Sequence, residues 1–203
     1  MSYCHYPILL ASSSAYRRQL FSKLRIPFSY HAPDIDEQAK PDETARQLVE
    51  RLACEKAAAL AAQYPEHIII GSDQVAVLKN SATEQILGKP GNQTNAFAQL
   101  RACSGQSVTF YTGLCVYHPA SATRDSLVSP FEVGFRKLSD AEISGYLELE
   151  QPFDCAGSFK SEGLGIALFK YMRGDDPNSL VGLPLIELLN ILRSRYGINP
   201  LTA

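Results

Sequence analysis

The sequence has no long hydrophobic run and no excess of positive charge. Its uninterrupted apolar runs extend over only a few residues, too few to cross a bilayer. The N-terminus lacks a basic region followed by a long apolar core, so we expect no signal peptide and a cytoplasmic location. Lys and Arg number 19 against 21 Asp and Glu, a formal net charge of −2. Neither a nucleic-acid polymer nor a membrane is therefore an expected partner, and any anionic ligand should be small.

Closely spaced cysteines are also missing. The five cysteines are odd in number, far apart in the sequence and form no C-x-x-C pair, which argues against a disulfide scaffold or a zinc knuckle. We expect them to be reduced thiols. The four histidines are equally scattered and indicate no histidine-based metal site. The cysteines are Cys4, Cys54, Cys103, Cys115 and Cys155.

What remains is an ordinary globular composition. The 203 residues are 45% apolar and 20% charged, which is enough to bury a sizeable core. No repeat, low-complexity segment or Pro/Gly-rich linker divides the chain. We therefore predict a single domain over residues 1–203, with room for two lobes around one cleft.

Hydrophobic patterns predict the main elements. The stretch "HIIIGSDQVAVLKN" predicts two strands separated by a turn at Gly71–Gln74. The other predicted elements are a strand at Pro7–Ala11, helices at about Ala15–Leu24, Thr44–Tyr64, 93–103, Ser139–Glu148 and Leu185–Leu192, and strands within 107–118 and 130–138. Because strands and helices mix without strict βαβ alternation, we predict an α/β or α+β fold with a mixed sheet.

The segment "ILLASSSAYRRQL" combines hydroxyls and guanidinium groups where a strand passes into a helix. Amide groups of a first helical turn lack intrahelical partners and favour anions. Arg17 and Arg18 add forked positive charge that suits phosphate oxygens. The alternative is a serine-rich helix cap followed by two solvated arginines.

Acidic residues occur at two places that could serve such an anion. Asp36 and Glu37 lie in a polar loop, and Asp73 directly follows an apolar strand. Carboxylates from two segments near a phosphate site could hold Mg²⁺, and a carboxylate free of the metal could deprotonate water. The alternative for Asp73 is a turn residue that bonds its own backbone.

Two lysines have contexts that could direct their charge. Lys56 follows Leu48 and Leu52 at four-residue spacing, at the edge of an apolar stripe, where a snorkelling side chain is the alternative. Lys89 lies between Gly88 and Pro90, a stiff extended context, although most lysines are merely solvated.

Taken together, these segments resemble the Maf-like nucleoside triphosphate pyrophosphatases. The matching segments are "LLASSSAYRR", "DIDE", "ACEKAAAL", "IIIGSDQV", "LGKP", "TFYTGL", "CAGSFKSEG" and "NSLVGLPL", in family order from about residue 8 to 186. Each is weak alone, but the ordered set is specific. The segments "GSDQ" and "KSEG" together resemble the branch that prefers 7-methyl-GTP.

The resemblance implies an inosine-triphosphatase-like α/β fold, with helices flanking a mixed, twisted sheet, and a homodimer. It also implies hydrolysis between the α and β phosphates, with a divalent cation such as Mg²⁺ or Mn²⁺. The implied roles are phosphate binding by Ser12, Arg17, Arg18, Lys56 and Lys89, metal binding by Glu37 and Asp73, proton acceptance from water by Asp73, and base preference through Tyr16, Gln74 and Glu162.

One position departs from the family. In the family, the turn before the two arginines commonly has proline where this chain has Ala15. Losing the fixed φ of proline costs ~0.4–1 kcal/mol in preorganisation of the phosphate-binding segment. The base-preference residues also suit a cationic methylated guanine, because Tyr16 offers an aromatic face and Glu162 a carboxylate acceptor.

Three alternatives remain: the same reaction on dTTP and UTP or another modified nucleotide, a nucleotide-binding regulator of cell division, or an interaction domain with structural polar turns.

Overall fold

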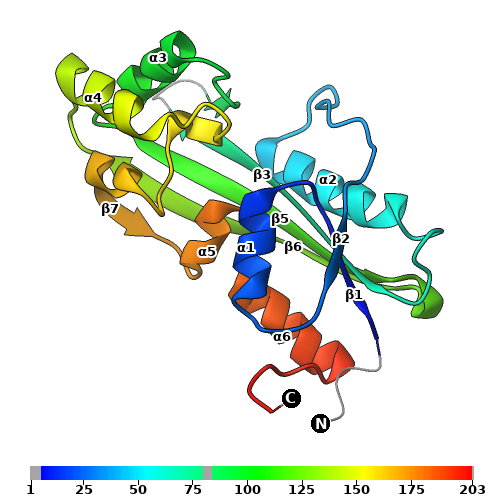
Figure 1. Cartoon of the computed structure of the whole chain (residues 1–203). Helices are drawn as coiled ribbons and strands as arrows, with labels where there is room; N and C mark the ends of the chain where they lie inside the picture. The colour runs from blue at the N-terminus through cyan, green and yellow to red at the C-terminus, as the bar shows by residue number, and fades with distance from the viewer. Residues whose placement is uncertain (1–5, 80–83, 203) are drawn as a thin grey trace. The chain divides into compact units, whose positions relative to one another are not determined.

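The computed structural model describes residues 6–79 and 84–202 (Figure 1). The strands are β1 (Ile8–Ala11), β2 (Ser29–His31), β3 (Ile68–Lys79), β4 (Glu84–Leu87), β5 (Ser107–His118), β6 (Thr123–Phe135) and β7 (Phe169–Arg173). The helices are α1 (Ala15–Ser22), α2 (Ala45–Ala59), α3 (Gln93–Cys103), α4 (Asp140–Glu150), α5 (Pro177–Val181) and α6 (Leu185–Tyr196). Short 3₁₀ turns occupy η1 (Pro119–Ser121), η2 (Ala156–Ser158) and η3 (Leu164–Leu168).

The strands form a seven-stranded sheet in the order β2-β1-β3-β5-β6-β7, with β4 paired to β3. Strand β1 is parallel to both β2 and β3, whereas the β3–β4 and β6–β7 pairs are antiparallel. The predicted α/β fold with a mixed sheet flanked by helices is confirmed.

The chain divides into two compact units. The first contains the described part of Met1–Gln74 together with Thr112–Ser129 and the described part of Asn178–Ala203. The second contains the described part of Val75–Tyr111 together with Pro130–Pro177.

Both faces of the sheet are covered in the first unit (Figure 1). Successive side chains of a strand point to opposite faces, so alternate residues of β1, β3 and β5 enter different cores. One set, which includes Leu10 and Ile70, packs with the apolar residues of α1 and α6. The other set, which includes Leu9 and Ile69, packs with Ala53 and Ala57 of α2. Burial on both faces explains why these strands are apolar throughout.

Two glycines allow α2 to lie directly on the sheet. A Cβ atom at Gly71 of β3 would overlap the carbonyl oxygen of Ala53, and one at Gly113 of β5 would overlap that of Val49. Each obstacle is helix backbone, which cannot turn aside as a side chain can. Glycine is therefore required at both positions for this close approach, and the approach sets where the side chains of α2 meet β3.

The predicted turn at Gly71–Gln74 is wrong, because β3 continues unbroken from Ile68 to Lys79. Gly71 is needed for the contact with α2 and not for a change of direction. The polar residues after it are also held within the sheet. Ser72 Oγ donates a hydrogen bond to the Gly113 carbonyl of β5 at 2.8 Å.

Local signals placed most helix boundaries correctly. Both predicted capping boxes are present, at Thr44–Gln47 before α2 and at Ser139–Glu142 before α4. Helix α2 ends at Ala59, before the expected Tyr64, and α6 extends beyond the expected end to Tyr196. The elements that the sequence analysis missed are β2, β7, α5 and the first half of β6.

The core of the second unit is aromatic. The rings of Phe110, Phe135, Phe159 and Phe169 meet edge to face, with centroids 4.8–5.8 Å apart. Helix α3 contacts both α4 and η2 in this unit. Gly157 of η2 has a φ of +76° and lies against Phe110 and Phe159, so a turn residue completes the aromatic core.

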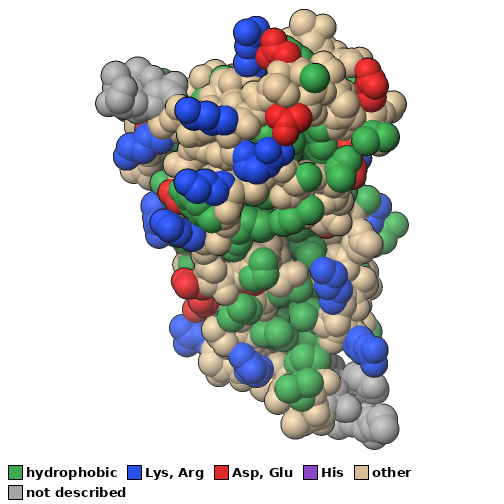
Figure 2. All heavy atoms as spheres, turned by 90° about the vertical axis from the view of Figure 1, so that its left-hand side faces the viewer, with side chains coloured by type: hydrophobic (Ala, Val, Ile, Leu, Met, Phe, Trp, Pro, Cys, Tyr) green, Lys and Arg blue, Asp and Glu red, His purple; other side chains and the backbone are tan. Residues whose placement is uncertain are grey.

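The described cysteines are free thiols, as expected: Cys54, Cys103, Cys115 and Cys155 form no disulfide, and Cys4 lies outside the described residues. None of the helices that the structure describes has the length and hydropathy needed to cross a membrane. On the face in Figure 2, acidic side chains occur among the lysines and arginines, so this face carries charge of both signs.

Candidate active site

A buried lysine joins two carboxylates in the first unit. Lys56 of α2 is only 5% exposed, and its Nζ lies 2.6 Å from Asp73 Oδ1 of β3 and 2.9 Å from Glu37 Oε1 of the preceding loop. The snorkelling interpretation of Lys56 is therefore wrong. A buried ammonium group needs such partners, because desolvating an unpaired charge is costly. The two acids exceed the lysine by one negative charge.

Asp73 keeps one oxygen available. It is 8% exposed, and Oδ1 accepts the bond from Lys56. Within residues 6–79 and 84–202, no group forms a hydrogen bond with Oδ2. Asp73 therefore lies inside a strand with its position fixed by Lys56, and it is not the turn residue of the alternative interpretation.

The Ser12–Arg18 segment lies at the same end of the β1–β3 pair. Ala11, the last residue of β1, pairs with Gly71 of β3. Ser12 comes directly after Ala11, and Asp73 lies two residues after Gly71, so both follow the same register pair in the parallel strands. Ser12 Oγ accepts a bond from Ser14 N at 3.1 Å, and Ser14 caps α1 by accepting from Arg17 N at 3.3 Å. The Ser12 hydroxyl keeps its proton for donation.

The two arginines are half-buried and held in place, so the interpretation as solvated arginines is wrong. Arg17 Nε donates to the Gly182 carbonyl at 2.8 Å. Burial lowers the pKa of the Arg17 guanidinium, and the charges of Asp73 and Glu37 oppose that shift. Arg18 donates from Nη1 to the Ser13 carbonyl at 3.0 Å, and its guanidinium carbon lies 4.4 Å from the centroid of the Tyr30 ring.

A buried polar network that the sequence analysis missed ties the segment after α5 to this site. The Gly182 carbonyl accepts from Arg17, and it lies 3.0 Å from Ser72 Oγ, whose single proton it shares with the Gly113 carbonyl. Thr112 Oγ1 donates to the Ser179 carbonyl at 2.8 Å. Gly182 has a φ of +113°, which strongly favours glycine, but the sequence offered no sign of this conformation beyond the dipeptide "GL" before a proline.

Gln74 is anchored by its amide nitrogen. Nε2 lies 2.7 Å from the Ser179 carbonyl, 3.2 Å from the Leu180 carbonyl and 2.9 Å from Thr112 Oγ1. Backbone carbonyls only accept, so the nitrogen must be the end that faces them. The end of the side chain that remains for a ligand is the acceptor Oε1. Tyr16 is half-buried near the start of α1.

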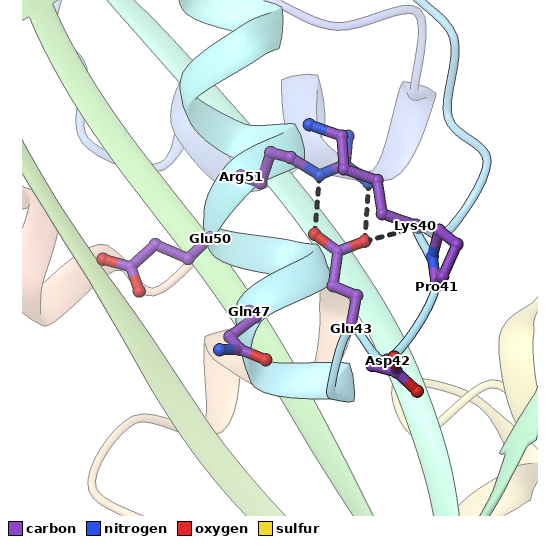
Figure 3. A pocket seen from close by; sticks show the side chains of 7 residues that line it. All are labelled: Lys40, Pro41, Asp42, Glu43, Gln47, Glu50 and Arg51. Carbon is purple, nitrogen blue, oxygen red and sulfur yellow. Dashed lines mark hydrogen bonds and ion pairs between the residues drawn. The ribbon is translucent and has the colours of Figure 1, made fainter.

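Arg51 of α2 holds the loop that carries Glu37, chiefly by binding Glu43, as Figure 3 shows. Its Nε and Nη2 bind the two oxygens of Glu43 at 2.6 and 2.7 Å, and Nη2 also donates to the Gln38 carbonyl at 3.0 Å. Nη1 binds Glu55 at 2.8 Å. The hydrogen bonds from Arg51 are the main cause that lowers the pKa of Glu43 to about 2. The sequence analysis missed this residue.

Arg51 and Glu43 also line a surface hollow of about 480 Å³ (Figure 3). None of the predicted site residues lines it. Its lining residues are Lys40, Pro41, Asp42, Glu43, Gln47, Glu50 and Arg51. Arg51 and Glu43 bind each other in this hollow, so we assign the hollow to loop anchoring.

Lys89 and Glu162 belong to the second unit. Lys89 is exposed in the loop after β4, next to buried Pro90. Glu162 is exposed in the turn between η2 and η3, where its Oε2 accepts a long bond from Ser161 Oγ at 3.4 Å. Glu150 fixes that turn, because its Oε1 accepts from Leu164 N at 2.6 Å.

Among the described residues, no group of three or more His, Cys, Asp or Glu side chains is arranged to hold a metal ion. Glu37 and Asp73 nevertheless converge on one cation, the ammonium of Lys56. Their carboxylate oxygens are the donors that hard cations such as Mg²⁺ prefer.

Comparison with known families identifies the chain. The family model described as Maf-like protein matches residues 7–195. The chain belongs to the Maf-like family. This match includes every predicted site residue, from Ser12 to Glu162, and the resemblance inferred from the sequence segments is confirmed.

Two relatives place the chain more narrowly within the Maf-like family. A protein of Pseudoalteromonas translucida named 7-methyl-GTP pyrophosphatase is 52% identical over 198 residues, covering 98% of this chain and 96% of the relative. A protein of Colwellia psychrerythraea with the same name is 52% identical over 194 residues, covering 96% and 94%. The similarity therefore extends over nearly the whole of each chain.

Proposed function

We propose that this Maf-like protein is a nucleoside triphosphate pyrophosphatase that hydrolyses 7-methyl-GTP to 7-methyl-GMP and diphosphate. The main observation behind the proposal is that two groups of residues lie at the same end of the β1–β3 pair. The Ser12–Arg18 segment supplies donors for phosphates, and Asp73, Lys56 and Glu37 supply an anchored carboxylate cluster. The relatives named 7-methyl-GTP pyrophosphatase support the choice of substrate.

The triphosphate would be held by donors that the fold already directs. The Ser12 hydroxyl and the guanidinium groups of Arg17 and Arg18 bind phosphate oxygens, with Arg17 kept in place by Gly182. Lys56 neutralises charge near Asp73, and Lys89 is proposed as a further phosphate ligand from the second unit. Forked guanidinium donors suit phosphate because two parallel bonds fix orientation as well as charge.

A divalent cation fits the donor set. Glu37 and Asp73 would hold Mg²⁺ or Mn²⁺, because such an ion often takes one or two protein carboxylates and completes its shell with water and phosphate oxygens. When bound, the ion would polarise the phosphoryl group and neutralise charge that develops on it. Arg51 would keep the Glu37 loop in place for this role through its bonds to Glu43 and Gln38.

Asp73 is the proposed proton acceptor. A water molecule attacks the α phosphorus, a new P–O bond forms, and the bond from this phosphorus to the bridging oxygen breaks, so that diphosphate leaves. The proton of the water passes to Asp73, whose Oδ1 is fixed by Lys56 at 2.6 Å while no described residue bonds Oδ2. Such general base catalysis contributes roughly 10²–10⁴-fold to rate.

Base preference would come from three side chains. The Tyr16 ring attracts the cationic methylated guanine, an effect of about 0.5–2 kcal/mol. Gln74 can present only Oε1, since Nε2 is bound by Ser179, and this acceptor matches a guanine edge donor. The Glu162 carboxylate is proposed to accept further edge donors, and it would disfavour pyrimidines that present a carbonyl there.

The decisive experiment is diphosphate release from a panel of 7-methyl-GTP, GTP, dTTP and UTP, with Mg²⁺ or Mn²⁺ added to chelator-treated protein. We expect the largest kcat/KM for 7-methyl-GTP, and a larger value for dTTP or UTP would contradict the substrate assignment. In ¹⁸O-labelled water, the label should enter 7-methyl-GMP. Label in the diphosphate would show attack at the β phosphorus and overturn the proposed step.

The Asp73→Asn variant tests the proton acceptor, because asparagine keeps an oxygen for Lys56 but is a poor base. We expect kcat to fall ~10²–10⁴-fold while nucleotide binding survives. Asp42→Asn is the matched control, since Asp42 is exposed, lies outside the site and has a φ of +59° that asparagine tolerates. Full activity of Asp73→Asn would exclude the assignment.

The proposed partner is a free nucleotide, and we propose a cytoplasmic homodimer. The dimer rests on the family resemblance, and light scattering of the purified protein tests it directly. A monomer at micromolar concentration would contradict this assembly.

A further inference from the structure

Two cysteines that the proposed reaction does not use lie together between α2 and β5. Cys115 of β5 is fully buried in the apolar cluster formed with Ala53 and Ala57 of α2, and half-buried Cys54 packs against that cluster. They are separated by many residues in the sequence, so only the fold brings them together. Both are free thiols.

The close contact of α2 with the sheet explains why the two thiols meet. Gly113 precedes Cys115 by two residues, so the two positions face the same side of β5. A Cβ atom at Gly113 would overlap the Val49 carbonyl oxygen, which shows that the helix backbone rests on the strand there. Cys54 lies five residues after Val49 on α2, where it packs against the cluster that contains Cys115 and interacts with the Cys115 thiol.

The surroundings of Cys54 favour its thiolate. The Cys115 thiol donates a hydrogen bond to the Cys54 sulfur, and the positive charge of Arg124 lies nearby. The Ser126 hydroxyl has one proton and lies within hydrogen-bond range of both the Cys54 sulfur and Glu50 Oε1, the latter at 2.9 Å. These contacts lower the pKa of Cys54 to about 7, although partial burial and the negative charge of Glu50 oppose the shift.

The same arrangement has the opposite effect on Cys115. Its thiol is the donor to Cys54, and both this bond and burial raise its pKa. Because Cys54 is the accessible thiol and Cys115 the buried one, we assign Cys54 as the nucleophile of the pair and Cys115 as its protonated neighbour.

We propose that Cys54 and Cys115 form a peroxide-reactive site in which Cys54 is oxidised first and Cys115 then closes a disulfide. The Cys54 thiolate attacks one oxygen of hydrogen peroxide, the O–O bond breaks, and Cys54 sulfenic acid and hydroxide form. The Cys115 sulfur then attacks the Cys54 sulfur, the S–O bond breaks, and the disulfide and water form. Two thiols lose two electrons and one peroxide gains them, so the reaction balances.

The first test follows the products in the full chain carrying Cys4→Ser, which removes the thiol outside the described residues. We expect one equivalent of hydrogen peroxide to reduce the intact mass by two hydrogens and to yield a Cys54–Cys115 cross-linked peptide. In Cys115→Ala, dimedone should trap the sulfenic acid at Cys54. An unchanged mass, or a cross-link between other cysteines, would overturn the proposal.

The second test needs no change in the buried pair. Iodoacetamide alkylation of Cys54 in the native protein should follow a pH profile centred near 7, because the thiolate is the reactive form. Cys155 is the matched control, since it is also half-buried but donates to the Asp154 carboxylate at 3.4 Å. Burial raises the pKa of Cys103 to about 12, so Cys103 should stay unlabelled. Faster labelling of Cys155 than of Cys54 at neutral pH would contradict the assignment.

Discussion

Replacing Gly71 with alanine will place a methyl group where the Ala53 carbonyl oxygen of α2 already lies. The backbone of Ala57 is also close, with its nitrogen 3.0 Å from the added Cβ. Because both obstacles are backbone, the helix and the strand must separate. Overpacking of this kind costs ~1–3 kcal/mol, and we expect about 3 kcal/mol because no side chain can turn aside.

The same displacement should reduce activity. Lys56 directly precedes Ala57, so moving α2 away from β3 lengthens the 2.6 Å contact between Lys56 Nζ and Asp73 Oδ1. A misplacement of about 1 Å in a catalytic group can lower turnover about 10²-fold. For a chain of this size, 3 kcal/mol corresponds to a Tm lower by about 6–12 °C. Thermal unfolding followed by circular dichroism and kcat for 7-methyl-GTP measure the two effects.

Gly145→Ala is the matched control. Gly145 lies inside α4, and a Cβ atom there meets nothing within 4 Å. Alanine should therefore stabilise the helix by about 0.5–1 kcal/mol and leave kcat unchanged. The two variants make the same chemical change with opposite expected signs. A Tm of Gly71→Ala equal to that of the wild type would refute the conclusion that glycine is there to admit the helix.

Three further predictions concern charged residues. The Glu43→Gln variant should be less stable than wild type above the ordinary pKa of 4.5, because the lowered pKa makes ionised Glu43 the stabilising form. The difference in free energy of unfolding should shrink as the pH falls toward 2. Urea unfolding at several pH values measures this difference, and a constant difference would contradict the prediction. Arg51→Lys keeps the charge but loses the forked bonds to Glu43 and the loop, so the Mg²⁺ concentration for half-maximal rate should rise about 10-fold with a small change in nucleotide KM, as titrations of both will show. Glu162→Gln should lower the ratio of kcat/KM for 7-methyl-GTP to that for UTP, and an unchanged ratio would remove Glu162 from base preference.

Local sequence signals predicted the elements whose causes are local. The capping boxes at Thr44 and Ser139 and the apolar run before Gly71 each lie within the element that they define. The predicted turn at Gly71–Gln74 was wrong for a nonlocal reason. Glycine and polar residues in a strand look like a turn until the helix that packs on them is known.

The residues of the candidate site could likewise be predicted from local motifs, whereas the contacts between them could not. Asp73, Lys56 and the Ser12–Arg18 segment could be named from the sequence, largely through family resemblance. The sequence could not show that Lys56 lies between Asp73 and Glu37, or that Arg51 fixes the loop beside Glu37. These contacts depend on how α2 is placed against β3 and the loop, which no local pattern encodes.

The carbonyl of Gly182 has a consequence for the order of synthesis. It accepts bonds from Arg17, 165 positions earlier, and from Ser72, 110 positions earlier. Translation therefore delivers Arg17 165 residues before the carbonyl that anchors it. A nascent chain therefore cannot form these hydrogen bonds until α5 and Gly182 have left the ribosome. A product truncated before α5 would contain Arg17 and Ser72 without the carbonyl that holds them in place.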